Sequence, residues 1–219
     1  MLEGGSINFV SVFLVIFIAA FIPLFVVTMT GFLKLSVVLF LVRNALGIQQ
    51  TPPNFALYAI ALVLAFYITT PLLSTAFARL SAQPIDTTSL DSLNAAAGRV
   101  KEPIQEHLAR YSYPAERQFF LSATARIWPE NARADVKDDS ILILLPSFIS
   151  SELTRAFEIG FLLYLPFLVV DLVVSNILMA MGMIMVSPTL ISIPLKLFLF
   201  VTVDGWSRLL HGLILSYAV

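Results

Sequence analysis

Residues Phe9 to Val42 read FVSVFLVIFIAAFIPLFVVTMTGFLKLSVVLFLV, an apolar run with a single charge at Lys34. A continuous helix of this length would measure roughly 50 Å at 1.5 Å per residue, whereas the hydrocarbon core of a bilayer is about 30 Å thick. The run must therefore break, tilt or extend beyond the lipid, and Pro23 and Gly31 are the expected break points. This stretch predicts an all-α protein with long, kinked apolar helices.

The composition of the whole chain agrees with that prediction. Of its 219 residues 58% are hydrophobic and 12% are charged, the net charge is −1 and the mean hydropathy is +0.91, whereas an ordinary soluble domain has about 25% charged residues. This balance excludes a disordered chain, a nucleic-acid-binding domain that relies on net charge, and most soluble enzymes. Because cysteine is absent, disulfides and thiolate chemistry are excluded as well.

Changes of composition divide the chain into three segments. Residues 1–78 are expected to form a hydrophobic helical hairpin, whose second arm is the uncharged run from Phe55 to Ala78. Residues 79–139 form a polar insert of mixed charge, and residues 140–219 form a second hydrophobic hairpin that includes a methionine-rich loop. Because Lys34 and Arg43 flank the first connector, the positive-inside rule places that connector in the cytoplasm and the insert on the other side of the membrane.

Local signals predict where helices lie in the insert and after it. Pro103, Pro114 and Pro129 favour two or three short helices in the insert, one of them amphipathic between Glu116 and Trp128. Beyond the insert, the stretch SSELTRAFE at residues 150–158 is typical of a helix start.

Several charged residues lie inside or beside apolar runs, where each would cost about 2.5–3.5 kcal/mol at the bilayer centre. A proton relay, an ion site and catalysis are conceivable uses, and buried ion pairing between helices or subunits is the structural alternative. The mixture of signs favours ion pairing over a cage of like carboxylates. The residues concerned are Lys34, Glu152, Arg155, Glu158, Asp171, Lys196 and Asp204.

A methionine cluster, MAMGMIMVSP, occupies residues 179–188. At helical spacing it could simply fill a core, since methionine adapts to irregular gaps. Alternatively, it could form a loop bounded by Gly182 and Ser187 at the axis of a channel, as a pliable apolar constriction. Both interpretations remain open on the sequence alone.

Catalytic motifs are absent: the chain has no GxSxG, HExxH, P-loop or GxGxxG pattern. His107 and His211 are interpreted as ordinary polar positions. We therefore predict a protein that is not an enzyme, with no catalytic, cofactor-binding or metal-ligating residues, no cofactor and no nucleic-acid partner.

The connector between the first two apolar runs reads RNALGIQQTPPN at residues 43–54, with the motif residues Arg43, Asn44, Gly47, Gln49, Gln50, Pro52 and Pro53. Further along the chain come PSFISSEL at 146–153, AFEIG at 156–160, LPFLVVDLV at 165–173, GMIMVSP at 182–188, PLK at 194–196 and DGW at 204–206. In this order the segments resemble the FliP/SctR family, the core export-gate subunits of flagellar and virulence type III secretion systems. The insert carries little of the resemblance.

The resemblance implies a helical ring assembly rather than a simple four-span membrane bundle. Copies of this chain would form a ring, a pentamer in the family, together with smaller subunits of the SctS/FliQ and SctT/FliR types and with the large gate and switch proteins of the export apparatus. Unfolded secreted proteins would pass along its axis across the bacterial inner membrane. The chain would contact lipid as a multi-pass protein and be raised partly to the periplasmic side in the assembly.

Site residues follow from the resemblance position by position. It implies a pore seal at Met183, Ile184 and Met185, where the family usually has three methionines followed by two prolines. Here isoleucine, which is stiffer at χ1, stands in the middle, and Ser187 precedes Pro188. The resemblance also implies a buried, inter-subunit salt bridge between Glu152 and Lys196, and we expect Lys34, Arg155, Glu158 and Asp171 to be buried charges in helix packing.

Three further interpretations complete the prediction. The acidic start with Glu3 and the sequence WPE at residues 128–130 favour the virulence (injectisome) type over the flagellar type. The main alternative function is a small ion-coupled membrane transporter, with Asp171, Glu158 and Lys34 as coupling groups. A purely structural scaffold of the secretion base is a third possibility.

Overall fold

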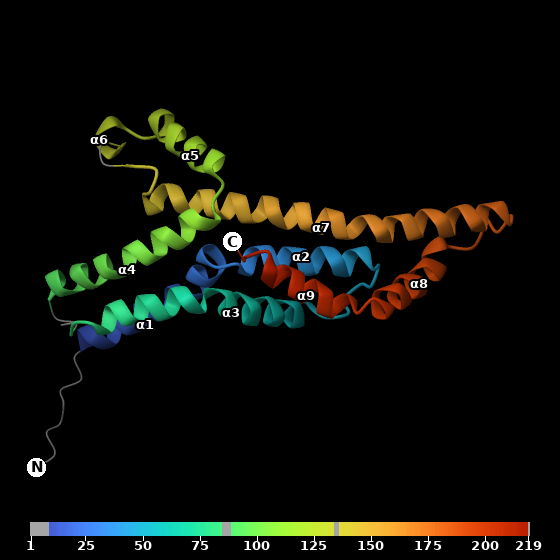
Figure 1. The fold of residues 1–219 in the computed structure, drawn as a ribbon, viewed down its shortest axis with the longest axis horizontal. Coiled ribbons are helices and arrows are strands. Elements are labelled where there is room, and N and C mark those ends of the chain that lie inside the picture. Colours follow the sequence, from blue (N-terminus) through green and yellow to red (C-terminus); the bar gives the residue numbers. More distant parts are fainter. Residues whose placement is uncertain (1–8, 85–88, 134–135, 219) are drawn as a thin grey trace, which may run out of the picture. The chain divides into compact units, whose positions relative to one another are not determined.

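The computed structural model describes residues 9–84, 89–133 and 136–218. Within these ranges the regular elements are all helices and no strand occurs, so the all-α prediction is confirmed (Figure 1). The start of the chain, including Glu3, lies outside the described residues. The helices are α1 (Phe9–Met29), α2 (Phe32–Ala45), α3 (Asn54–Ser81), α4 (Leu90–Tyr111), α5 (Pro114–Ile127), α6 (Glu130–Arg133), α7 (Ile141–Ala180), α8 (Pro188–Thr202) and α9 (Gly205–Leu215).

Packing groups the chain into two compact units, each made of two separate stretches. Unit 1 comprises Met1–Thr30 and Thr69–Glu152, and unit 2 comprises Gly31–Ile68 and Leu153–Val219. The helices α3 and α7 each contribute residues to both units. This grouping follows contacts, whereas the predicted three segments followed composition, so the three-part division stays a prediction.

The expected break at Gly31 is confirmed, because α1 ends at Met29 and α2 begins at Phe32. The expected break at Pro23 is wrong, since α1 continues through that residue, as α3 continues through Pro71 and α8 through Pro194. A proline removes one backbone hydrogen bond, and an apolar helix tolerates that loss where the flanking turns are intact.

Helix α7 is a single element of 40 residues, drawn in Figure 1 as one unbroken ribbon. The predicted helix start at residues 150–158 is wrong, because this stretch lies inside α7. The actual start is at Ser140, whose carbonyl accepts the amides of Ile143 and Leu144 at 2.9 and 2.8 Å. The hydroxyls of Ser147 and Ser151 donate to carbonyls one turn back, each at 2.6 Å, so these serines are satisfied within the helix.

Unit 2 has a core built on α2 and the first half of α3. Four buried residues of α2 follow the helical spacing i, i+3, i+4, i+7, and three buried residues of α3 recur every fourth position. Two of the α3 residues are alanines, which permits the close approach of neighbouring helices. The residues are Leu35, Val38, Leu39 and Val42 on α2, and Leu57, Ala61 and Ala65 on α3.

Unit 1 contains the described part of the insert. The helix expected between Glu116 and Trp128 is confirmed as α5, which begins with proline at its first position and ends before Pro129. Its amphipathic character is not confirmed, because Phe119 and Ile127 of the expected apolar face are 62% and 75% exposed. The helix α4 runs through Pro103, so that proline does not separate two helices. Leu108 of α4 is buried, as are Ile143, Leu144 and Phe148 in the first turns of α7, and the rings of His107 and Phe148 lie 6.0 Å apart.

By length and composition α3 and α7 could each cross a membrane, and up to four spans result if α1 with α2 and α8 with α9 each count as one broken span. The α8–α9 pair is bent by 64° at its break. At 1.5 Å per residue α7 is about 60 Å long, twice the thickness of the hydrocarbon core. Multi-pass topology is therefore compatible with the fold, although α7 does not fit the bilayer as a simple upright span.

Candidate functional site

An ion pair between a buried lysine and a half-buried aspartate joins three helices of unit 2. The Nζ atom of Lys196 on α8 lies 2.6 Å from Oδ2 of Asp171 on α7 and donates to the carbonyl of Ala45 on α2 at 3.0 Å. Ala45 is the last residue of α2, so its carbonyl belongs to the negative end of that helix. The ammonium of Lys196, which is almost fully buried, is therefore balanced by a carboxylate and by a helix terminus.

Glu152, the partner expected for Lys196 from another subunit, lies on the unit 1 part of α7 and is fully buried. The Glu152–Lys196 bridge was expected between different copies of the chain, so it stays a prediction. Within one chain the structure instead shows Lys196 bonded to Asp171, two of the charges that the sequence places in apolar runs.

The other charges in apolar runs differ in their burial. Lys34, in the first turn of α2, is fully buried, and its Nζ lies 3.4 Å from the centroid of the Tyr217 ring, a cation–π contact. Arg155 is half-buried on α7, whereas Glu158 is exposed. The expectation that Glu158 is buried fails within a single chain, and its burial against another subunit stays a prediction.

The methionine cluster forms the turn between α7 and α8. Helix α7 ends at Ala180, Gly182 has a φ of 74°, and α8 begins at Pro188. Met183, Ile184 and Met185 are 39%, 85% and 100% exposed. The loop interpretation therefore fits the structure, and core filling within one chain does not, because Met185 contacts nothing that would bury it.

The exposure of this loop, residues 181–187, limits what it can do alone. Apolar side chains at the tip of a turn gain from burial, at roughly 25 cal/mol per Å² of apolar surface. Since the loop's own chain leaves Ile184 and Met185 uncovered, any cover must come from lipid, other proteins or other copies of the chain. A barrier made of these residues would therefore have to be shared between chains.

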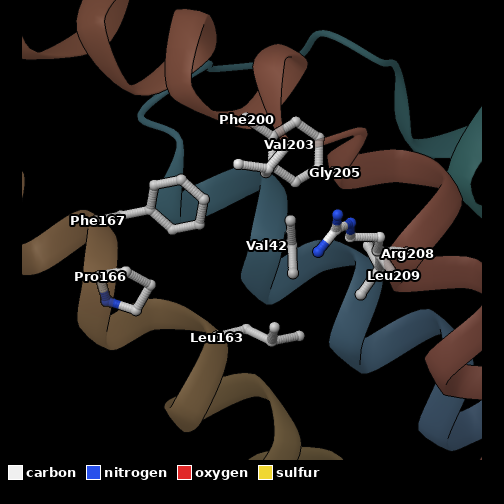
Figure 2. A pocket seen from close by; sticks show the side chains of 9 residues that line it. All are labelled: Val42, Leu163, Pro166, Phe167, Phe200, Val203, Gly205, Arg208 and Leu209. Carbon is white, nitrogen blue, oxygen red and sulfur yellow. The ribbon is translucent and has the colours of Figure 1, made fainter.

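An apolar groove of about 270 Å³ opens on unit 2 (Figure 2). Sequence reasoning missed this groove, because its lining comes from four separate helices and the α8–α9 turn. Arg208 contributes its only charge. The lining residues are Val42, Leu163, Pro166, Phe167, Phe200, Val203, Gly205, Arg208 and Leu209.

The wall of the groove formed by α8 and α9 depends on a glycine. A Cβ atom at Gly205 would lie 2.7 Å from Cγ of Phe200, closer than real side chains approach. The preceding residue, Asp204, has a φ of 54° and turns the chain into α9. The residues DGW at 204–206 therefore form the corner between α8 and α9. The glycine in this stretch is a local sequence signal for such a corner.

The connector motif folds into a compact loop. Arg43 Nη1 donates to Oδ1 of Asn54 at 2.6 Å and to the carbonyl of Pro52 at 3.2 Å, which closes the loop upon itself. Gly47 has a φ of 76°, and a Cβ there would lie 3.0 Å from Cγ1 of Ile193 on α8. Asn44, Gln49, Gln50 and Pro53 are exposed. Arg43 and Gly47 of the motif therefore stabilise the fold, whereas its four exposed residues lie on the surface of the chain.

His107 lies in unit 1 on α4, against the rings of Tyr111 and Phe148, with centroid separations of 5.1 and 6.0 Å. Burial lowers the pKa of His107 to about 4; a hydrogen bond with the backbone of Met29 opposes the shift and the nearby charge of Arg110 adds to it. The imidazole is therefore neutral at pH 7. Such a group packs as an aromatic residue.

Across residues 9–84, 89–133 and 136–218, no three His, Asp or Glu side chains come together in a group that could hold a metal ion. The ammonium of Lys196 instead pairs with a carboxylate and with a helix end. The arrangement serves to join helices and to present apolar surface.

The sequence matches the FliP family over residues 15–213. It is 56% identical over 194 residues to a probable translocation protein, y4yL, of Sinorhizobium fredii, a match that covers 89% of this chain and 87% of the relative. It is 46% identical over 208 residues to the Yop proteins translocation protein R of Yersinia pestis, covering 95% and 96% of the two chains. The virulence protein YscR of Salmonella typhimurium is 44% identical over 209 residues, with 93% and 94% covered.

Proposed function

Because the chain belongs to the FliP family, with relatives named for translocation and virulence, we propose that it is a core subunit of the export gate of a type III secretion system. Similarity to virulence proteins supports the injectisome type over the flagellar type, as the sequence predicted. The protein is a membrane protein with two to four apolar spans. In this proposal it performs no chemical step.

The observation that carries the proposal is the exposed turn between α7 and α8. Met183, Ile184 and Met185 stand at the end of a helix about 60 Å long, outside the packing of their own chain. Several copies of such a turn, brought together around an axis, would form a ring of apolar side chains. Unbranched methionines can adapt to a passing chain, whereas Ile184 adds apolar bulk with fewer rotamers.

Ring formation accounts for the apolar surface that one chain leaves uncovered. On the part of α7 in unit 2, Phe161, Leu162 and Val169 are more than half exposed, and on α3 the same is true of Val63, Phe66 and Tyr67. We propose that copies of this chain, a pentamer as in the family, and the smaller SctS- and SctT-type subunits cover these faces. The large gate and switch proteins would bind the assembly as separate chains, and unfolded secreted proteins would be its cargo.

We assign the assembly to the bacterial inner membrane, raised partly to the periplasmic side. The length of α7 supports this placement, because a helix twice as long as the hydrocarbon core must leave the lipid at one end or both. The ion-coupled transporter is the weaker candidate, because the carboxylate of Asp171 is paired with the ammonium of Lys196 and is not left open to bind an ion.

The sealing role is tested by replacing both methionines at the tip of the turn with alanine, Met183→Ala together with Met185→Ala. In cells that make the complete apparatus, we expect the inner membrane to leak small molecules, while assembly of the complex is unchanged. The matched control is Met179→Ala with Met181→Ala, which removes two exposed methionines of the same cluster outside the proposed seal.

Two results would contradict the seal. Unchanged permeability in the Met183/Met185 variant would show that these side chains are not the barrier. Equal leakage in the Met179/Met181 control would show that the effect belongs to the whole cluster rather than to its tip.

A further inference from the structure

The start of α2 is poorly stabilised by its own sequence. Gly31 occupies the N-cap position, and no side-chain hydrogen bond caps the helix there, although the first amides of a helix need partners. The first turn contains no acidic residue and carries the cation Lys34, which the positive end of the helix dipole disfavours. Lys34 is also fully buried. This end of α2 therefore depends on contacts from elsewhere in unit 2.

Tyr217 contacts this end of α2 at two points, the carbonyl of Gly31 and the ammonium of Lys34. Its hydroxyl donates to the carbonyl of Gly31 at 3.4 Å, and its ring faces Nζ of Lys34, 3.4 Å from the ring centroid. The side chain is almost fully buried. The end of α9 fixes its position, since the amide of Tyr217 donates to the carbonyl of Ile214 at 3.1 Å and that of Ser216 donates to Gly212 at 2.9 Å.

The glycine at position 31 leaves the space that Tyr217 fills. A Cβ atom there would lie 2.6 Å from Cζ of Tyr217 and closer still to its hydroxyl oxygen. Gly31 has a φ of −67°, which any residue can adopt. The reason for glycine here is therefore the close approach of the tyrosine and not the backbone conformation.

We propose that Tyr217 is a positioning residue that locks the start of α2 and, through it, the buried ammonium of Lys34. The ring stabilises the cation, the hydroxyl gives the Gly31 carbonyl a second donor beside the Leu35 amide, and the absence of a side chain at Gly31 leaves room for the ring. The segment after α9 thereby helps to hold α2 in place. At the other end of α2, the carbonyl of Ala45 accepts a hydrogen bond from Lys196. This assignment concerns unit 2 alone and does not rest on the proposed function.

The test measures hydrogen–deuterium exchange in peptides that cover residues 32–36 of the full chain in detergent micelles. Tyr217→Leu removes both the ring face and the hydroxyl, and we expect exchange there to accelerate about thirtyfold, the effect of losing a desolvated cation–π contact. Tyr217→Phe keeps the ring face and should accelerate exchange only about threefold. Tyr67→Leu, at an exposed tyrosine of α3 in the same unit, is the matched control and should change nothing.

A suppression experiment separates a specific contact between Tyr217 and Gly31 from a general packing role of the tyrosine. Gly31→Ala should accelerate exchange strongly, because its methyl group meets the tyrosine ring. Adding Tyr217→Leu should remove that extra effect, since leucine does not reach Cζ, whereas adding Tyr217→Phe should not, since Cζ remains. Gly212→Ala is the control glycine, because a Cβ there has no neighbour within 4 Å.

Several outcomes would overturn the proposal. Normal exchange in Tyr217→Leu would show that the ring does not stabilise the start of α2. Additive effects of Gly31→Ala and Tyr217→Leu would show that the two positions do not share one contact. If Gly31→Ala does not fold, the series Tyr217→Phe and Tyr217→Leu still decides, because equal exchange in both would remove the role of the ring. Leakage and particle mass are independent readouts, so failure of the export-gate proposal is recognised separately.

Discussion

Lys196 makes bonds in two directions, to a carboxylate on α7 and to the last carbonyl of α2. The lysine stem crosses apolar surroundings, and its charge is almost entirely removed from water. A single ammonium therefore caps the end of α2 and forms an ion pair with α7. Lys196 thereby connects α7 and α2 to α8 through polar contacts.

We predict that Asp171→Asn destabilises the chain by about 3 kcal/mol, because it leaves the almost fully buried ammonium of Lys196 without its counter-charge. Lys196→Ala should cost less, about 2 kcal/mol, since the Asp171 carboxylate that it leaves is 36% exposed and can be hydrated. Unfolding in detergent by denaturant measures both. The control is Lys101→Ala, at an exposed residue of α4; equal losses in Lys196→Ala and the control would contradict the prediction.

His107 gives a prediction about pH. Its pKa is lowered from 6.5 to about 4 in the folded chain, so the unfolded chain binds the proton more tightly. Stability should be independent of His107 above pH 6.5, fall as the pH decreases from 6.5 to 4, and be lower by about 3 kcal/mol at the end of that range.

The measurement is the free energy of unfolding between pH 7.5 and 4 for the natural chain and for His107→Gln, which cannot titrate. The variant should lose most of the slope in this window. A slope that persists unchanged would assign the pH dependence to other groups.

At the scale of elements, tight turns decide how neighbouring helices meet. Gly47 in the connector and Gly182 in the methionine turn both have positive φ, but only at Gly47 would a Cβ meet a neighbour, Ile193 of α8. Backbone strain and steric contact can therefore be separated by comparing these two glycines with Gly212, a helical glycine that has neither constraint.

We predict that Gly182→Ala costs about 1–2 kcal/mol from backbone strain, and that Gly47→Ala costs more because its methyl group also meets Ile193. Gly212→Ala should be neutral or slightly stabilising, since alanine favours helices over glycine by up to about 1 kcal/mol. Thermal unfolding of the three variants in detergent gives the order. An equal loss for Gly47→Ala and Gly182→Ala would show that the contact with Ile193 carries no cost.

The sequence predicts elements better than it predicts their ends. Apolar runs and local signals were sufficient for the all-α class, for the break at Gly31 and for the helix from Pro114. They failed at Pro23 and inside α7, because the loss at a proline is local, about 3 kcal/mol, and packing over a long helix outweighs it. The Lys196–Asp171 pair and the place of Tyr217 depend on how distant helices meet, which no local period encodes.

At the scale of the whole molecule, one chain is an incomplete structure. Large aromatic and aliphatic residues along α1, α3 and α7 are exposed, and large exposed apolar surfaces are typical of interaction sites. Lipid and other subunits are the two possible covers. The fraction of this apolar surface that each of them covers decides whether the chain is an ordinary membrane bundle or a component of a larger helical assembly.

We predict that the purified particle is a multimer of this chain, extended by partner subunits when these are produced together, and that Glu152→Ala abolishes the multimer by removing the inter-subunit partner of Lys196. Native mass spectrometry measures the copy number. Glu158→Ala, at an exposed carboxylate on the same helix, is the control. A stable multimer of Glu152→Ala chains would contradict the inter-subunit bridge, and a monomeric natural chain would contradict the ring.

The length of α7 also sets how the chain behaves before it assembles. To keep a helix of about 60 Å within a hydrocarbon layer of about 30 Å, the helix would have to lie about 60° from the membrane normal, beyond the 0–40° range that spanning helices occupy. Such hydrophobic mismatch costs fractions of a kcal/mol for each ångström. In the proposed export gate, raising part of α7 out of the lipid would remove this cost.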